Sequence, residues 1–218
     1  MPPEPLILAF DTSAAHCAAA LLLGETVLDQ RVEPMSKGQA ERLFPLLAEI
    51  LADAGKDWSD LTALGVGTGP GNFTGIRLSV ASARGLALSL GIPAVGVSTF
   101  QALSEGLPRP TLVAVDARRG QTYLQVLHND HAAAPLLWGE GDDLSAYAAD
   151  ALCCVGDHAL DFAAALGIKA AEPAMPVATA IARVALDRHR SAQPRPAPLY
   201  IRSADAAPAA DPPPVILP

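Results

Sequence analysis

The residues of this chain best suited to chemistry form a glycine-rich loop and a short polar segment at the end of an apolar run. The loop opens the stretch VGTGPGNFTGIRLSVASARGLALSLG, residues 66–91, in which a helical pattern continues over residues 75–90. Glycine lets backbone amides approach a ligand closely, and a helix N-terminus attracts anions. Asp11, Thr12 and Ser13 follow the apolar residues 6–10 and add a carboxylate and two hydroxyls. These groups predict either a cradle for a nucleotide phosphate or a tight structural turn.

The spacing within the loop matches neither GxGxxG nor GxxxxGK[ST], so a dinucleotide fold or a Walker-type NTPase is not indicated. The loop also has no lysine to neutralise a phosphate. We therefore predict a weak or vestigial site for ATP or ADP, with no cofactor required by the chain. The alternative, in which Asp11 caps loop amides and the loop is a retained element of the fold, stays open. The predicted phosphate-binding residues are Asp11, Thr12, Ser13, Gly69, Gly71, Asn72 and Thr74.

The remaining reactive side chains predict no catalytic or metal site. Cys17, Cys153 and Cys154 lack the spacing of zinc ligands, and we interpret them as small buried hydrophobic residues. His128 and His131 lie close in a polar turn, with no thiol or evident carboxylate at ligand spacing. Ser13, Ser36 and Ser98 lack the strand-turn context of a nucleophile elbow. Serine hydrolysis and metal catalysis are therefore unsupported.

Composition sets further bounds. Half of the 218 residues are hydrophobic, and no apolar run approaches the roughly 20 residues of a membrane span. The N-terminal residues lack the basic start of a signal peptide, so we expect a soluble cytoplasmic protein without membrane contact. The formal net charge of -8 argues against broad electrostatic binding of nucleic acid by this chain alone. Any RNA is expected to be held by a partner.

The elements that must position the loop can be followed along the first half of the chain. Apolar runs at residues 6–10, 17–23 and 26–32 predict an antiparallel meander. Residues 38–54 carry leucines and isoleucine at helical spacing, with a kink expected at Pro45. Strands are expected at 61–66 and 94–97, on either side of the helix launched by the glycine loop.

The second half repeats this order. LVAVDARRGQTYLQVLHND contains a strand that ends in Asp116, a polar turn and a second strand at residues 122–127, as does the segment around Asp11. We predict two lobes built on one plan, residues 1–103 and 104–218, joined near residues 99–110. In the second lobe we expect helices at 142–149, 157–166 and 177–190 and a strand at 152–155. Residues 199–202 are expected to pack back as an extended segment, followed by a loose proline-rich tail.

Two lobes with strand-end aspartates and a glycine loop between them are typical of actin-like ATP-binding folds. The stretch GTGPGNFTGIRLSVASARGLA resembles the GPGSFTGLR signature of the TsaB (YeaZ) family. The resemblance extends to FDTS, AERLFPLL, VDARRGQTY and PLYIR, and so covers most of the chain. It implies an α/β, two-lobed actin-like ATPase (ASKHA) fold, in which each lobe is a mixed sheet flanked by helices.

The family's implied role is accessory rather than catalytic. Its members assist TsaD, the catalytic relative, in forming threonylcarbamoyladenosine in tRNA. In TsaD an HxxxH pair binds metal after the glycine-loop helix, and here Thr99 and Leu103 fall at those positions. A hydroxyl and an aliphatic side chain cannot replace two imidazole ligands. We therefore expect no metal, no catalysis, and a scaffold that binds and activates a TsaD-like subunit, helped by a TsaE-like ATPase and contacting tRNA only through the complex.

The first-lobe helices are the expected partner surface, because family members pair with themselves or with the catalytic relative through them. Burial in the chain's own core is the competing interpretation of the same apolar stripes. Two other functions remain as alternatives: an enzyme, either a metal-dependent glycopeptidase or an ATP-hydrolysing protein, and a self-associating homodimer. The predicted interface residues are Leu43, Leu46, Leu47, Ser79, Ser82, Ala83 and Leu86.

Overall fold

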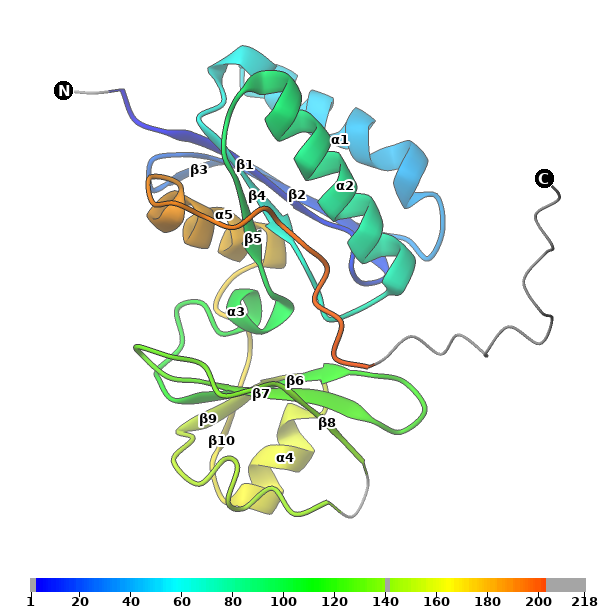
Figure 1. The fold of residues 1–218 in the computed structure, drawn as a ribbon, viewed down its shortest axis with the longest axis vertical. Helices are drawn as coiled ribbons and strands as arrows, with labels where there is room; N and C mark the ends of the chain where they lie inside the picture. The colour runs from blue at the N-terminus through cyan, green and yellow to red at the C-terminus, as the bar shows by residue number, and fades with distance from the viewer. Residues whose placement is uncertain (1–2, 140–141, 203–218) are drawn as a thin grey trace, which may run out of the picture.

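The computed structural model describes residues 3–139 and 142–202, which form two lobes lying one above the other in Figure 1. The first lobe contains the N-terminal half of the chain, and the second lobe follows from the middle of the sequence. The proline-rich tail predicted beyond residue 202 lies outside the described residues.

The first lobe is built on a five-stranded mixed sheet. Its strands are β1 (Leu6–Asp11), β2 (His16–Leu23), β3 (Thr26–Pro34), β4 (Ala63–Gly67) and β5 (Ala94–Val97), in the spatial order β3-β2-β1-β4-β5. Strands β1 to β3 form the expected antiparallel meander, which reverses between β2 and β3 at Gly24 with a positive φ of 53°. Strands β4 and β5 run parallel to β1. All of β1 and β4 is buried, as expected for central strands covered on both faces.

Helices cover both faces of this sheet. Helix α1 (Gln39–Asp53) and helix α2 (Phe73–Leu90) pack on one face, where Leu43, Leu47 and Ala83 share a core with alternate residues of β1. Helix α1 runs through Pro45 as one continuous helix, with a short 3₁₀ turn, η1 (Trp58–Asp60), following it. Helix α5 (Val177–Arg188) covers the opposite face, against the other set of alternating strand residues.

The second lobe repeats the strand order of the first. Its strands are β6 (Thr111–Asp116), β7 (Thr122–Leu127), β8 (Leu136–Trp138), β9 (Cys153–Gly156) and β10 (Lys169–Ala171), arranged β8-β7-β6-β9-β10. Strands β6 to β8 are antiparallel, and β9 and β10 run parallel to β6. Asp116 ends β6 as Asp11 ends β1. The two-lobed architecture with a mixed sheet in each lobe is thereby confirmed.

Two helices complete the second lobe and connect it to the first. Helix α4 (Ala159–Leu166) packs on one face of the second sheet through Phe162 and Ala163. Helix α3 (Thr99–Leu103) lies between the lobes in Figure 1. Its Phe100 belongs to the core of the second sheet, whereas Ala102 packs with α5 and the first sheet. This short helix therefore joins the two cores.

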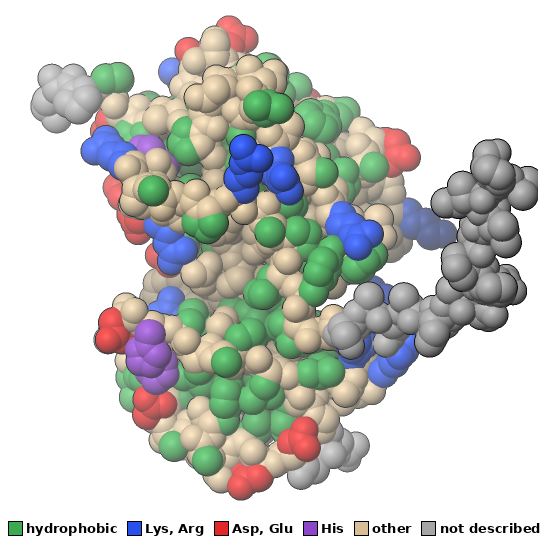
Figure 2. All heavy atoms as spheres, in the orientation of Figure 1, with side chains coloured by type: hydrophobic (Ala, Val, Ile, Leu, Met, Phe, Trp, Pro, Cys, Tyr) green, Lys and Arg blue, Asp and Glu red, His purple; other side chains and the backbone are tan. Residues whose placement is uncertain are grey.

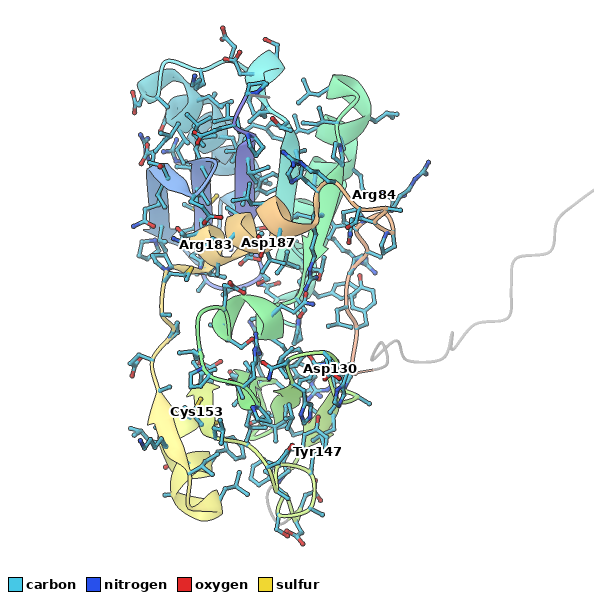
Figure 3. The ribbon with its side chains drawn as sticks, turned by 90° about the vertical axis from the view of Figure 1, so that its left-hand side faces the viewer. Arg84, Asp130, Tyr147, Cys153, Arg183 and Asp187 are labelled. Atoms are coloured by element: carbon cyan, nitrogen blue, oxygen red, sulfur yellow. The ribbon has the colours of Figure 1, made fainter. Side chains whose placement is uncertain are left out.

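The chain departs from the expected division in its last part. Helix α5 falls within residues 104–218, yet it packs on the first sheet, and Figure 3 shows its Arg183 and Asp187 in that lobe, far from Cys153 of the second. The physical reason is its apolar face, which covers the side of β1, β2 and β4 that α1 and α2 leave open. Residues 142–149, expected to be helical, form no helix, because 142–144 have no regular structure and 145–149 form turns.

Candidate functional site

The polar residues after β1 bond mainly to one another. The Asp11 carboxylate is 2 % exposed, and its Oδ2 accepts hydrogen bonds from the Ser13 amide at 3.1 Å and the Ser13 hydroxyl at 2.9 Å. His16 Nε2 lies 2.7 Å from the same oxygen. One oxygen of the predicted ligand group is therefore already engaged by this chain's own side chains.

Thr12 is locked to helix α2 by three buried hydrogen bonds. Its hydroxyl donates to the Gly75 carbonyl oxygen at 2.7 Å, and its amide donates to Ser79 Oγ at 2.9 Å. The two hydroxyl oxygens of Thr12 and Ser79 lie 2.7 Å apart. Because the Thr12 hydrogen points to Gly75, the Ser79 hydroxyl must donate in that pair. Each polar atom is thus satisfied internally, as buried polar groups require.

The glycines of the loop permit this close packing. An added Cβ at Gly67 would overlap the Asp11 carboxylate, and one at Gly75 would overlap the Thr12 carbonyl oxygen. The N-terminus of α2 is also occupied, since Asn72 Oδ1 accepts from the amides of Thr74 at 3.0 Å and Gly75 at 3.5 Å. The Asn72 amide in turn donates to the Ser13 carbonyl oxygen at 2.6 Å.

The structure brings all seven predicted phosphate-binding residues together at the ends of β1 and β4. Asp11, Thr12, Ser13 and Gly69 are buried, Asn72 is half-buried, and Gly71 and Thr74 are exposed. The glycine loop packs on the Asp11 segment, and its capping groups serve helix α2. This arrangement favours the second of the two expectations, a retained element of the fold.

The returning end of the chain passes beside this loop. The Leu199 amide donates to the Thr68 carbonyl oxygen at 2.8 Å, while Leu199 and Ile201 pack into the core of the second lobe. The ring centroid of Tyr200 lies 5.4 Å from that of Phe73, and Arg77 donates to the Tyr200 hydroxyl at 2.8 Å. Residues 199–202 therefore pack back onto the molecule as predicted and bridge both lobes.

The predicted partner surface requires a correction, because most of its residues are core residues. Leu43, Leu46, Leu47, Ser79 and Ala83 are 0 % exposed, Ser82 is 9 % exposed, and Leu86 is half-buried against the same core. The periodicity correctly indicated one face of each helix. That face is the one that covers the sheet, since a helix on a sheet buries its most apolar stripe first.

The outer face of the same helices carries the accessible apolar side chains. Phe73, Arg77, Ala81, Arg84 and Leu88 are exposed at intervals of three or four residues, which places them along one side of α2. Leu88 is 86 % exposed and Phe73 is 47 % exposed. Figure 2 shows hydrophobic and basic side chains intermingled over this lobe. The sequence does contain a signal for this exposed face, because its residues also recur at helical spacing. That signal is weaker than the one from the buried apolar stripe of the same helix.

Phe44 of α1 adds a further exposed aromatic side chain, at 43 %. A groove of about 510 Å³ runs between the second half of α2 and residues 191–196, lined on one side by Arg84 and Leu88. Figure 3 shows Arg84 on the outside of the first lobe, close to the returning chain.

The histidines predicted to lie in a turn form a stacked pair. The ring centroids of His128 and His131 are 4.2 Å apart, and the two rings contact Asp150 at 3.5 Å and Asp130 at 2.7 Å respectively. These carboxylate partners were not evident from the sequence. Within residues 3–139 and 142–202, no three His, Cys, Asp or Glu side chains group so that they could hold a metal. No helix in the same part of the chain is long and apolar enough to cross a membrane.

Two lobes of equal strand order, with a glycine loop at the end of β4, define a protein of the actin-like (ASKHA) class. A solved structure from Pseudomonas aeruginosa, described as an uncharacterized protein with similarity to peptidase YEAZ, superposes with a TM-score of 0.72 at 25 % identity. It covers 91 % of this chain and 100 % of that one. Component A of (R)-2-hydroxyglutaryl-CoA dehydratase from Acidaminococcus fermentans shares the fold, with a TM-score of 0.59 at 10 % identity over 86 % of this chain and 100 % of that one.

Sequence comparisons identify the family within that class. A family model described as "TsaD: tRNA N6-adenosine threonylcarbamoyltransferase" matches residues 23–139. The Escherichia coli tRNA threonylcarbamoyladenosine biosynthesis protein TsaB is 38 % identical over 122 residues, 54 % of this chain and 52 % of that protein. An uncharacterized protein of Mycobacterium tuberculosis is 33 % identical over 208 residues, 94 % of this chain and 95 % of that protein. The chain belongs to the TsaB (YeaZ) family of TsaD-related proteins, and its alignment with the Escherichia coli TsaB spans about half of that relative's length.

Proposed function

We propose that this chain acts in the formation of threonylcarbamoyladenosine in tRNA as an accessory subunit that binds and activates a TsaD-like catalytic subunit. The family supports the pathway, because similar proteins are named for tRNA threonylcarbamoyladenosine biosynthesis. The structure supports an accessory role through the glycine-loop segment, in which the Gly75 carbonyl oxygen accepts a hydrogen bond from Thr12 and the Asn72 backbone amide donates one to Ser13 of the same chain. Such a loop serves as a scaffold that presents helix α2.

The observation that carries the proposal is the exposed side of α2. The side chains of Leu88 and Phe73 are apolar and exposed to water, and the exposed residue Ala81 lies between them on the same side of the helix. Two exposed arginines, Arg77 and Arg84, lie on this side as well. Interface cores combine apolar, aromatic and arginine side chains in this way. The bonded and buried inner face of the helix holds this surface rigid, which lowers the entropic cost of binding.

The remaining partners follow from the same assignment. A TsaE-like ATPase joins the complex, tRNA is contacted through the complex, and nucleotide binding at the glycine loop is weak or lost. A homodimer formed through the outer face of α2 would compete with the TsaD-like subunit for the same residues. The enzymatic alternatives, a glycopeptidase or an ATPase, require turnover or bound metal in the isolated chain.

The test compares two exposed leucines on different lobes. Leu88 on α2 is 86 % exposed and Leu160 on α4 is 77 % exposed, so replacing either by aspartate leaves the core intact. We expect Leu88→Asp to weaken binding of the TsaD-like protein of the same organism about tenfold or more, because a charge would be buried in an apolar contact. Leu160→Asp should bind as the unmodified protein does.

Binding is measured by calorimetry with purified proteins, and function by the threonylcarbamoyladenosine content of tRNA in cells carrying each variant as the sole copy. The expected result is weaker binding and a lower content of modified nucleoside with Leu88→Asp, and neither change with Leu160→Asp. Equal behaviour of the two variants would reject α2 as the docking surface. Normal modified nucleoside in cells that lack the protein altogether would reject the pathway assignment.

A further inference from the structure

A cavity lies in the second lobe, away from the glycine loop and the exposed side of α2. Its volume is about 730 Å³, enough for a side chain or small molecule. It is bounded by the end of β6, the end of β8, the turn after residue 141 and helix α4. The residues used below are Asp116, Trp138, Asp142, Asp143, Asp161 and Phe162.

The cavity lies in the second lobe at the position that corresponds to the glycine loop in the first lobe. Strands β6 and β9 run parallel, as β1 and β4 do, and ligands of open α/β sheets bind beyond the carboxyl ends of such strands. In the first lobe five residues, 68–72, link β4 to α2 and fold over Asp11, which is 2 % exposed. In the second lobe only residues 157–158 link β9 to α4. Asp116, the counterpart of Asp11, remains exposed and lines the cavity.

The floor of the cavity is aromatic. The rings of Trp138 and Phe162 meet edge to face, with centroids 5.0 Å apart. The indole of Trp138 is fixed by a hydrogen bond from Nε1 to the Asp142 carbonyl oxygen at 2.9 Å. A flat cation stacks favourably on the face of such an indole.

The wall is acidic. Asp116, Asp142, Asp143 and Asp161 line the cavity, and none of the described residues lining it is lysine or arginine. Backbone amides orient three of these carboxylates: Arg118 donates to Asp116 at 2.8 Å, Gly139 donates to Asp142 at 2.9 Å, and Ser145 donates to Asp143 at 2.8 Å. Asp161 lies 3.9 Å from His158. Figure 2 shows acidic side chains spread over the lower part of this lobe.

We propose that this cavity is a binding site for a guanidinium group, which stacks on Trp138 and donates to the carboxylates around it. A guanidinium fits better than an ammonium because it is planar, weakly hydrated and presents forked donors to carboxylates. The group is supplied either by a free small molecule or by an arginine side chain of a peptide. This site is separate from the proposed docking surface and does not depend on the proposed function.

The test uses Trp138 as its own reporter. The chain contains two tryptophans, so Trp58→Phe leaves Trp138 as the single tryptophan, whose emission can be excited selectively over that of the three tyrosines. Ethylguanidinium represents the free source, and an acetylated, amidated Gly-Arg-Gly peptide represents the side-chain source. The same peptide with citrulline in place of arginine keeps the shape and removes the charge. We expect a saturable change of Trp138 emission with the arginine peptide, with ethylguanidinium, or with both, and none with the citrulline peptide.

Single substitutions distinguish binding in this cavity from nonspecific attraction of a cation to an acidic protein. Asp142→Asn and Asp161→Asn should each weaken binding about threefold to fivefold, the scale of one partly exposed ion pair. Asp150→Asn removes the same charge from the same lobe outside the cavity and should change nothing. Far-ultraviolet circular dichroism checks that each variant is folded. No saturable change at about 20 mM probe, equal binding of the citrulline peptide, or equal weakening by Asp150→Asn would overturn the proposal.

Discussion

Substitution of Ser79, which contacts Thr12, tests whether the glycine-loop segment stabilises the fold. Ser79→Ala removes the acceptor of the Thr12 amide and the donor to the Thr12 hydroxyl, both inside a region of 0 % exposure. An amide left buried without a partner costs about 1–3 kcal/mol. The same change also gains about 0.5 kcal/mol of helix propensity, because alanine favours a helix more than serine does.

The matched control is Ser89→Ala, an exposed serine near the end of the same helix. It carries the same gain in propensity and loses no buried bond. We expect Ser79→Ala to lower the free energy of unfolding by about 2 kcal/mol relative to Ser89→Ala. For a chain of this size that difference lowers Tm by about 6 °C. Urea denaturation measures the free energy of unfolding and thermal denaturation measures Tm, each followed by circular dichroism.

Equal stability of the two variants would refute the view that the bonds between Thr12 and Ser79 stabilise the fold. A second measurement addresses the ligand: because Asp11, Thr12 and the Asn72 side chain already have partners, about 5 mM ATP or ADP should leave Tm unchanged. A nucleotide that binds the native state raises Tm in proportion to ln(1 + [L]/Kd). A saturable rise in Tm would show that the loop still holds phosphate.

Three further outcomes follow from buried and charged groups. Ala83→Glu should unfold the first lobe, since Ala83 is 0 % exposed within the core, and calorimetry should show loss of its thermal transition rather than a folded protein that fails to bind. Arg42 bonds bidentately to Glu33 and to Glu49, and these bonds hold the pKa of both carboxyls below the ordinary value. Their stabilisation is therefore present above that ordinary value and is lost as pH falls through the lower pKa of the folded state. Arg42→Gln should accordingly make Tm less sensitive to pH as the pH falls below the ordinary carboxyl pKa of 4.5, and an unchanged pH profile would contradict this. Burial raises the pKa of the Cys154 thiol to about 12, so iodoacetamide at pH 8 should label it only after denaturation, as mass spectrometry can show.

Much of the architecture could be predicted because its signals are local. The apolar runs, the turn at Gly24 and the helical spacing on either side of the glycine loop all depend on residues near one another in sequence. The repeated pattern ending in Asp11 and Asp116 correctly indicated two sheets of one design. Strands β8 and β10 have three residues each, too few for a periodic pattern to show.

The exposed surface of the helices and the placement of α5 could not be predicted, because both depend on tertiary packing. Helical spacing identifies an apolar stripe, but only the sheet beneath α1 and α2 decided that Leu43 and Ala83 lie inside, while Leu88 faces water. The same spacing cannot show that α5 returns to the first sheet, because every strand it packs on ends at least eighty residues earlier in the sequence: Val177 begins α5 and Val97 ends β5.

The sequence by itself determined the two lobes, the family resemblance and the set of residues that meet around the glycine loop. The tertiary structure decided their use: the aspartate of the first lobe is covered by its own loop, whereas the aspartate of the second opens onto a cavity. The physical reason is the length of the connection from strand to helix, which is five residues after β4 and two residues after β9. Whether such a connection covers the neighbouring aspartate is decided only when the strands lie side by side in the sheet.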